Sequence, residues 1–361
     1  MFDVSYQPPG YEDALDVNTS LAVEYLAKHR EAPKLSVAAM LPPLSREAIR
    51  TLLVVDAACD LPRAWLDFNA VAVMPRIVRF RNEELVDIPG SDRASVLADK
   101  IHRDADRAAV SLPHSSVAMR DHMQRFMLSG TEAVLHLCSS ARRSKHFVNA
   151  LSATQSLVLI HNKVRRTLGQ QSSVTAWVID SMNVLGGVGV LVSHAVRLRE
   201  RGMLAANIAV TLNSFRSNVH TLIVPNDLAV AANGARTLEQ QAIPAWKLTF
   251  AGALGLKPVV HVNGDRLQRI RAVRGHVAAT GGVFSQIESL VTRGALSTPF
   301  VAVSHAGKLD TVERLTAYHS LRSACSRHQV TLSLAPMSMT GTLALGPGAT
   351  AASFASQQFR A

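Results

Sequence analysis

Residues 134–147, VLHLCSSARRSKHF, place two hydroxyls and a group of positive charges directly after an apolar run. The run predicts a buried strand, and the hydroxyl of Ser139 or Ser140 can cap a helix that begins near Ala141. Three cations would then lie in the first turn of that helix: Arg142, Arg143 and Lys145. Each costs about 0.3–1 kcal/mol there unless an anion is bound, because free N–H groups already make a helix N-terminus positive. The residues therefore indicate either a seat for a carboxylate or phosphate, or a solvated helix start.

Two other strand-like runs end in an aspartate. Asp56 begins the sequence DAACD, and Asp180 is followed by Ser181. An aspartate at the carboxyl end of a strand is a common position for phosphoryl-transfer or metal chemistry. For the second aspartate of DAACD, Asp60, a cap on the helix that opens at Leu61-Pro62 is the simpler interpretation.

The glycines that follow Ser181 do not complete a dinucleotide-binding fingerprint. They read Gly186-Gly187-x-Gly189, and Val192 stands where the third glycine would be needed. Close packing of a helix on a sheet is the favoured interpretation. A second glycine-rich stretch, Gly346-Pro347-Gly348, predicts a rigid loop that brings backbone N–H groups close to whatever lies beside it.

The histidines and cysteines form no familiar metal or catalytic motif. The 14 histidines include no HxxxH or HExxH pair, and no GxSxG elbow is present. The three cysteines, Cys59, Cys138 and Cys325, lie far apart, which excludes a disulfide framework and a cysteine-type zinc site. We therefore expect no metal ion and no cofactor. His305 ends the strand-like run PFVAVSHA and is the histidine best placed for a ligand, although a lone histidine there is commonly structural.

Composition narrows the class of protein. The formal net charge of +11 suggests a nucleic-acid binder, but the charges are dispersed and aromatic residues make up only 5 %, too few for stacking platforms. We therefore consider nucleic acid an unlikely partner. No apolar stretch approaches the roughly 18–20 residues of a membrane span, and the acidic, proline-broken N-terminus does not resemble a signal peptide. We expect a soluble cytoplasmic protein, with 48 % hydrophobic residues to build its cores.

The elements that must position these residues alternate between strand and helix. Strand-like runs rich in Val, Leu and Ile cover residues 51–57, 70–80, 132–140, 156–161 and 174–180. Amphipathic helical patterns cover residues 94–108, 116–128, 144–155 and 188–202. Near-continuous apolar strands between helices predict a parallel sheet that is covered on both faces. Ligands in such sheets bind outside the carboxyl ends of the strands.

The pattern changes from about residue 222. The sequence VVHVNGDRLQRI predicts a β-hairpin with Asn263-Gly264 as a primed turn. Further elements are predicted as a helix (278–293), a strand (299–306), a helix (309–327) and a strand (329–336). We expect an N-terminal extension over 1–47 with one helix near 19–30, a parallel-sheet α/β domain over 48–221, and an α+β domain over 222–361.

The order of several short motifs resembles that of the DegV family of bacterial fatty-acid-binding proteins. LLVVDAACDLPRAWLDFNAVAVMPRIVRFRNEELVD is similar to the family's opening, and SLPHSS, LHLCSS and VIDS occupy the positions of its serine-containing motifs. NGARTLEQQA, LKPVVHVNGDRLQRIRAVRG and GPGATAASF follow in the family's order. The resemblance covers roughly residues 51–355, and the collinearity of the motifs is more specific than any one of them.

The resemblance implies a two-domain α/β fold that holds one fatty acid between the domains. It further implies a binding protein, not an enzyme, that presents the acid to a partner kinase for acyl phosphate formation. The head-group contacts would be the pair Ser139-Ser140 and the loop at Ser111. Arg236 and His305 match the family's arginine and histidine near the carboxylate and the kinase-facing surface. Gly346 and Gly348 match its closing glycines.

This chain departs from the family pattern near the head group. Ala57-Ala58, Val110 and Ala235 stand where the family has hydroxyl residues or glycine, and residues 142–145 replace neutral residues with cations. Either Arg142 and Arg143 now hold the carboxylate by charge, or the chain binds another anionic or phosphorylated small molecule. The second alternative includes an enzyme that uses Asp56, Asp180 and His305.

Overall fold

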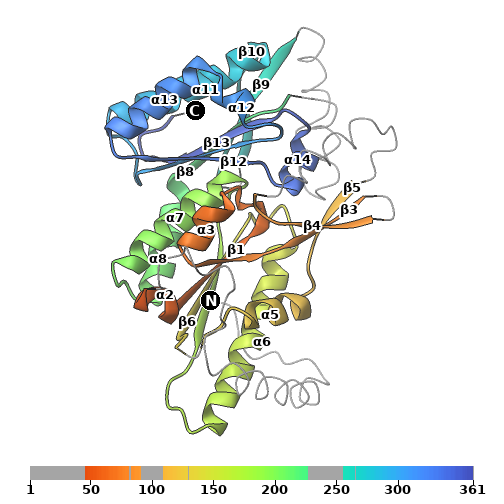
Figure 1. Cartoon of the computed structure of the whole chain (residues 1–361), viewed down its shortest axis with the longest axis vertical. Coiled ribbons are helices and arrows are strands. Elements are labelled where there is room, and N and C mark those ends of the chain that lie inside the picture. The colour runs from red at the N-terminus through yellow and green to blue at the C-terminus, as the bar shows by residue number, and fades with distance from the viewer. Residues whose placement is uncertain are drawn as a thin grey trace.

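A computed structural model describes residues 45–80, 83–90, 109–128, 130–226, 255–264 and 266–360. The predicted helices near 19–30 and over 94–108, and the site residue Arg236, lie outside the described residues. A parallel sheet occupies the lower half of the molecule in Figure 1, and a six-stranded sheet occupies the upper half. The mixed α/β class predicted from the sequence is confirmed, with a parallel N-terminal sheet and a mixed C-terminal sheet.

The parallel sheet has the strand order β2-β1-β6-β7. Its strands are β1 (Thr51–Asp56), β2 (Val71–Met74), β6 (Ala133–Cys138) and β7 (Thr175–Asp180). The predicted strand over 70–80 is split at Pro75, because proline has no N–H to give to a ladder. Beyond it, β3 (Arg76–Phe80) pairs with β4 (Glu83–Asp87) and β5 (Ala109–Pro113) in a separate antiparallel sheet.

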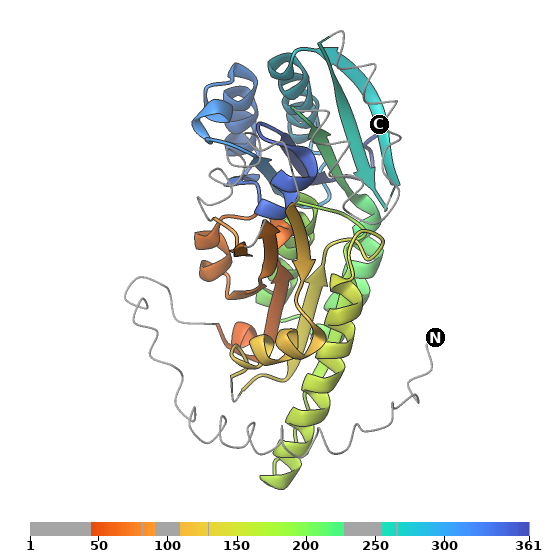
Figure 2. The ribbon, with the colours of Figure 1, turned by 90° about the vertical axis from the view of Figure 1, so that its right-hand side faces the viewer.

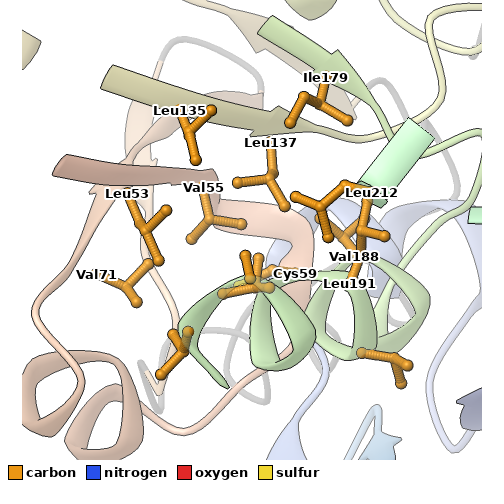
Figure 3. Close-up of a cluster of buried hydrophobic side chains, with 14 of the residues drawn as sticks. Leu53, Val55, Cys59, Val71, Leu135, Leu137, Ile179, Val188, Leu191 and Leu212 are labelled. Carbon is orange, nitrogen blue, oxygen red and sulfur yellow. The ribbon is translucent and has the colours of Figure 1, made fainter. Parts of the chain in front are cut away.

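Helices cover both faces of the parallel sheet. The core on one face joins Leu53, Val55, Leu135 and Leu137 to the helix α7 (Gly186–Glu200), as Figure 3 shows. The helices α3 (Arg63–Phe68) and α8 (Ala205–Phe215) complete that side. The opposite face lies under α5 (Ser116–Gln124) and α6 (His146–Thr167), which pack on the alternate residues of the same strands.

The strand predicted over 156–161 is wrong, because these residues continue α6. The buried side chains of α6 recur at spacings of three and four residues, which is the helical period: Ala150, Ala153, Leu157, Ile160 and Val164. A short apolar run cannot be assigned to a strand or a buried helix by its composition alone. Figure 2 shows the whole length of α6, which extends away from the six-stranded sheet.

The six-stranded sheet has the order β10-β9-β8-β13-β11-β12, and only β11 and β12 pair in parallel. Its strands are β8 (Val219–Val224), β9 (Leu256–Asn263), β10 (Arg266–Arg274), β11 (Phe300–His305), β12 (Thr331–Pro336) and β13 (Thr350–Ala355). The helices α11 (His276–Thr292) and α13 (Thr316–Arg327) share one core with it, and α12 (Asp310–Glu313) precedes α13. The predicted division at 221/222 falls inside β8, and the domain boundaries stay a prediction.

The predicted hairpin is present, but Asn263 is not a turn residue as expected. Asn263 pairs with Arg266, so it is the last residue of β9. Gly264 has φ +54°, the left-handed conformation that favours glycine.

The glycines at the start of α7 let this helix pack closely on the six-stranded sheet. A Cβ on Gly186 would lie 2.9 Å from the Cβ of Ala302 in β11. A Cβ on Gly187 would lie only 2.3 Å from Oδ1 of Asn183 and 2.6 Å from Oγ1 of Thr221 in β8. Close packing of a helix on a sheet, expected for these glycines, is therefore what they provide.

We predict that Gly187→Ala lowers the free energy of unfolding by roughly 1–3 kcal/mol, because the added methyl overpacks a buried contact. Gly281→Ala in α11 is the matched control: its Cβ would meet the Cβ of Ala317 at an ordinary 3.7 Å. That change should stabilise the helix by about 0.5–1 kcal/mol. Urea unfolding of both variants measures the two effects, and equal signs would contradict the packing role of Gly187.

Candidate functional site

The carboxyl ends of the parallel strands collect the polar residues singled out in the sequence. Asp56 ends β1, Ser139 and Ser140 follow β6, and Asp180 ends β7. These strands run in the same direction, so the residues meet at one edge of the sheet. The edge adjoins the segment before α14 (Met339–Leu345), which follows β12, because the N–H of Ser338 donates to Asp60 Oδ1 (2.9 Å).

A buried ion pair forms the centre of this edge. Arg76 of β3 donates from Nε to Asp56 Oδ1 (2.8 Å) and from Nη2 to Asp56 Oδ2 (2.7 Å). The Ser139 hydroxyl donates to Asp56 Oδ2 (2.7 Å), and the N–H of Ala58 donates to Oδ1 (2.9 Å). Burial opposes ionisation of Asp56, but the charge and hydrogen bonds of Arg76 outweigh it and hold the pKa of this carboxyl well below its usual range. The carboxylate is therefore charged and fully bonded within the protein.

The helix predicted to begin near Ala141 begins later than predicted. The helix α6 begins at His146, and residues 141–143 form a turn before it. The predicted serine cap is absent at α6, because its N-cap residue is Lys145 and makes no side-chain cap bond. Two long-range contacts hold the residues before α6 at the sheet edge: the Ser139 hydroxyl donates to Asp56, and Asp180 Oδ1 accepts the N–H of Ala141 (3.1 Å).

The three cations are therefore not in the first turn of a helix. Arg142 and Lys145 are exposed and Arg143 is half-buried. They lie in the segment that leaves the carboxyl edge of the sheet, immediately after the Ser139-Ser140 pair. Positive charge is thus concentrated beside the edge, and among these cations only Lys145, the N-cap residue of α6, lies at a helix N-terminus.

Ser111 belongs to a second polar network next to the first. Asp87 accepts the N–H groups of Met339 (3.0 Å) and Thr340 (2.9 Å) and the Thr340 hydroxyl (2.7 Å). Ser111 Oγ lies 2.7 Å from Thr340 Oγ1, whose single proton goes to Asp87, so Ser111 is the donor in that pair. Asp87 stands opposite Arg76 in the β3–β4 ladder, which places the two networks side by side.

Asp60 does not cap the helix that follows it, contrary to the simpler interpretation of its sequence. The helix α3 begins at Arg63 after Pro62, with no side-chain cap bond. Asp60 instead has φ +49° and turns its carboxylate to the N–H of Ser338. Its Oδ2 is buried and has no hydrogen-bond partner among the described residues. Burial raises the pKa of Asp60 to about 7, more than its hydrogen bonds lower it.

His305, Gly346 and Gly348 lie at the ends of elements in the six-stranded half. His305 is buried at the end of β11, with Nδ1 at 3.0 Å from the Thr350 hydroxyl, and burial lowers its pKa to about 4. The N–H of Gly346 donates to Thr342 O (2.8 Å) and that of Gly348 to Ala306 O (2.7 Å). Both N–H groups are bonded within the protein, and a ligand contact by these three residues stays a prediction.

Comparison with known proteins identifies the fold and the family. The sequence profile of the DegV family, described as uncharacterised proteins, matches residues 50–357. The chain belongs to the DegV family. A DegV domain-containing protein from Xanthomonas campestris is 30 % identical over 325 residues, 86 % of this chain and 98 % of that protein. A second from Xanthomonas axonopodis is 28 % identical, with the same coverage of 86 % and 98 %.

Solved DegV structures share the fold at low sequence identity. The chain is similar to DegV of Bacillus subtilis, described as a fatty acid binding protein, with 17 % identity, a TM-score of 0.64, and 85 % and 99 % of the two chains covered. It is also similar to a DegV family protein of Thermus thermophilus described by its fatty acid binding, with 20 % identity, a TM-score of 0.62, and coverage of 85 % and 99 %. Among the described helices, none is both long enough and apolar enough to cross a bilayer.

Sequence reasoning missed three residues that organise the carboxyl edge of the parallel sheet. Arg76, Asp87 and Thr340 were not assigned any role, although the first two lie in the segment that carries the family resemblance. One signal was available: Arg76 directly follows Pro75, so it begins a new strand at the end of the parallel sheet. Its partner Asp56 could not be read from spacing.

Proposed function

We propose that this DegV protein binds a long-chain fatty acid with its carboxylate at the polar edge formed by Asp56, Ser139 and residues 140–145. The observation that carries the proposal is the fold match over nearly the whole length of neighbours described as fatty acid binding proteins. One such neighbour, from Eubacterium ventriosum, is described as binding stearic acid and matches with a TM-score of 0.62. The family membership of residues 50–357 supports the same function.

The hydrogen bonds of the edge suggest how the head group is held. An ionised carboxylate can only accept hydrogen bonds. The proton of Ser139 is given to Asp56 and that of Ser111 to Thr340, so neither hydroxyl can donate to a ligand without leaving its partner. Donors and positive charge come instead from the exposed cations Arg142 and Lys145. In this proposal the head group is held mainly by charge.

The side chains that an enzyme would use are already bonded within the protein, which fits a binding role. The Asp56 carboxylate is paired with Arg76, and the N–H groups of Ala141 and Met182 donate to Asp180 Oδ1 (3.1 and 2.9 Å). His305 is bonded to Thr350 and buried. These contacts support a binding protein. Presentation of the bound acid to a partner kinase for acyl phosphate formation rests on the family resemblance, in which Arg236 and His305 match the arginine and histidine near the carboxylate and the kinase-facing surface.

A second candidate ligand is a compact anion such as a phosphorylated small molecule, which the cations of residues 142–145 favour. The two candidates differ in what is extracted from the protein. Mass spectrometry of the purified chain after denaturing extraction should yield one long-chain fatty acid per molecule. Absence of any acyl species, together with no response to titrated fatty acid, would reject the proposal and leave the compact anion.

We predict that Arg142→Gln/Lys145→Gln weakens fatty-acid affinity by about 3–10-fold, because each exposed charge contributes roughly 0.2–1 kcal/mol to a partner. The loss should shrink at high salt, which screens exposed charges. The control is Arg166→Gln at the far end of α6, which should leave affinity unchanged. Fluorescence titration with a labelled fatty acid measures both, and an equal loss in the control would argue against local charge recognition.

A further inference from the structure

Three side chains with metal-binding atoms meet beneath the polar edge. His136 and Cys138 are alternate residues of β6, so they point to the same face of the sheet, the face covered by α6. His146 is the first residue of α6. One ligand atom from each, a ring nitrogen or the sulfur, lies within 4.8 Å of the others. No other group of this kind occurs among the described residues.

The imidazoles of this group lack the partners that buried rings require. His136 and His146 are both 0 % exposed, and none of their four ring nitrogens has a hydrogen-bond partner. Their rings lie edge to face, with centroids 5.5 Å apart, so they contact each other without a hydrogen bond. Buried polar groups are nearly always satisfied, and two unsatisfied rings side by side require an explanation. A metal ion between them would use one lone pair from each.

We propose that His136, Cys138 and His146 form a binding site for a divalent transition-metal ion, and that Zn²⁺ is the ion its donors fit best. Two imidazole nitrogens and one thiolate are donors that Zn²⁺ takes, whereas Mg²⁺ and Ca²⁺ require oxygen. Tetrahedral coordination brings such atoms to about 3.5 Å from one another, so side-chain rotations must draw the three together. On binding, the Cys138 thiol loses its proton to solvent, and the sulfur–metal bond replaces the S–H bond.

Asp56 lies next to the proposed ligand His146 and can orient its ring. Its Oδ2 lies 4.0 Å from Nδ1 of His146. Zinc-bound histidines commonly give their other N–H to a carboxylate, which fixes the ring and its tautomer. Because this oxygen already accepts from Arg76 and Ser139, Asp56 acts on His146 through its negative charge, which favours a proton on Nδ1 and leaves Nε2 to the metal. The ion would then stabilise the same edge that carries Ser139, while its ligands remain separate from the exposed cations that we assign to the fatty acid.

The test uses the full chain and Co²⁺ as a spectroscopic probe for Zn²⁺. The three ligands are buried, so the protein is unfolded, stripped with a chelator and refolded with one equivalent of Co²⁺ or with none. We expect a thiolate-to-Co²⁺ charge-transfer band, its loss on addition of Zn²⁺, and about one Zn²⁺ retained per chain after gel filtration. Absence of the band and of retained Zn²⁺ in the refolded wild-type protein would overturn the proposal.

Two cysteine variants separate this site from adventitious binding. Cys138→Ser should abolish the band and the retained Zn²⁺. Cys325→Ser, which changes an equally buried cysteine in the other half of the molecule, should leave both intact. A band that survives in Cys138→Ser places the metal elsewhere and rejects the site. The wild-type measurement decides whether the metal site exists even if Cys138→Ser fails to fold. Fatty-acid extraction is measured separately, so failure of the metal proposal and failure of the fatty-acid proposal can be told apart.

Discussion

Replacing Arg76 by methionine is expected to lower the free energy of unfolding by about 3–5 kcal/mol, because it leaves Asp56 as an uncompensated buried charge. The guanidinium is 3 % exposed and the carboxylate 0 %, so water cannot replace the lost partner. The Ser139 hydroxyl and the Ala58 N–H remain, but they supply dipoles and no charge. Urea unfolding of the wild type and the variant measures the loss.

The same strand provides a matched control. Arg79 pairs with Glu84 across β3 and β4 at 2.7 Å, but both side chains are more than half exposed, at 56 % and 54 %. Exposed pairs of this kind contribute about 0–1 kcal/mol, so Arg79→Met should change stability by no more than that. Similar losses for the two variants would show that burial of the Asp56–Arg76 pair is not what makes it important.

A second substitution tests the physical cause. In the Arg76→Met background, Asp56→Asn removes the stranded charge and keeps an amide oxygen that can accept from Ala58. Much of the lost stability should return, because a neutral buried pair avoids the desolvation penalty of a lone ion. If Arg76→Met instead acts by a cavity or by disturbing β3, the double variant will be at least as unstable as the single one.

The strands could be predicted where burial on both faces makes them continuously apolar. This holds for β1 and β6, whose residues are all buried. The same criterion failed for 156–161, where the apolar residues belong to a buried helix. It also overlooked β13 (Thr350–Ala355), whose alanines and serine are small. This strand lies between β8 and β11, and its place in the sheet comes from long-range pairing that local composition does not encode.

The candidate site was predictable in its location but not in its bonding. Parallel strands bring their carboxyl ends together, so Asp56, Ser139 and Asp180 could be placed at one edge from the strand pattern alone. Which of them bond could not be foreseen, because Arg76 lies 20 residues and Ser139 lies 83 residues from Asp56. The contact of Ser139, together with the bond from the Ala141 N–H to Asp180, holds the segment before α6 at the sheet edge.

Asp60 should make the protein less stable as the pH rises from 5 to 8. Burial raises the pKa of this carboxyl to about 7 from the 3.8 of a solvated aspartate, with the negative charge of Asp87 adding to the effect. The folded state therefore binds the proton more tightly than the unfolded chain. The stabilisation is complete below about pH 4 and is lost as the pH rises through 7, with about 3 kcal/mol lost between pH 5 and pH 8.

The variant Asp60→Asn isolates this contribution, because asparagine keeps an oxygen for the N–H of Ser338 and cannot ionise. The difference in unfolding free energy between the variant and the wild type should therefore shift by about 3 kcal/mol in favour of the variant from pH 5 to pH 8. Asp67→Asn, which changes an aspartate paired with Arg63 at the surface, is the control for the substitution itself. A constant difference for Asp60→Asn would mean that Asp60 stays ionised in the folded protein, and that its contact with the segment before α14 is charged at every pH tested.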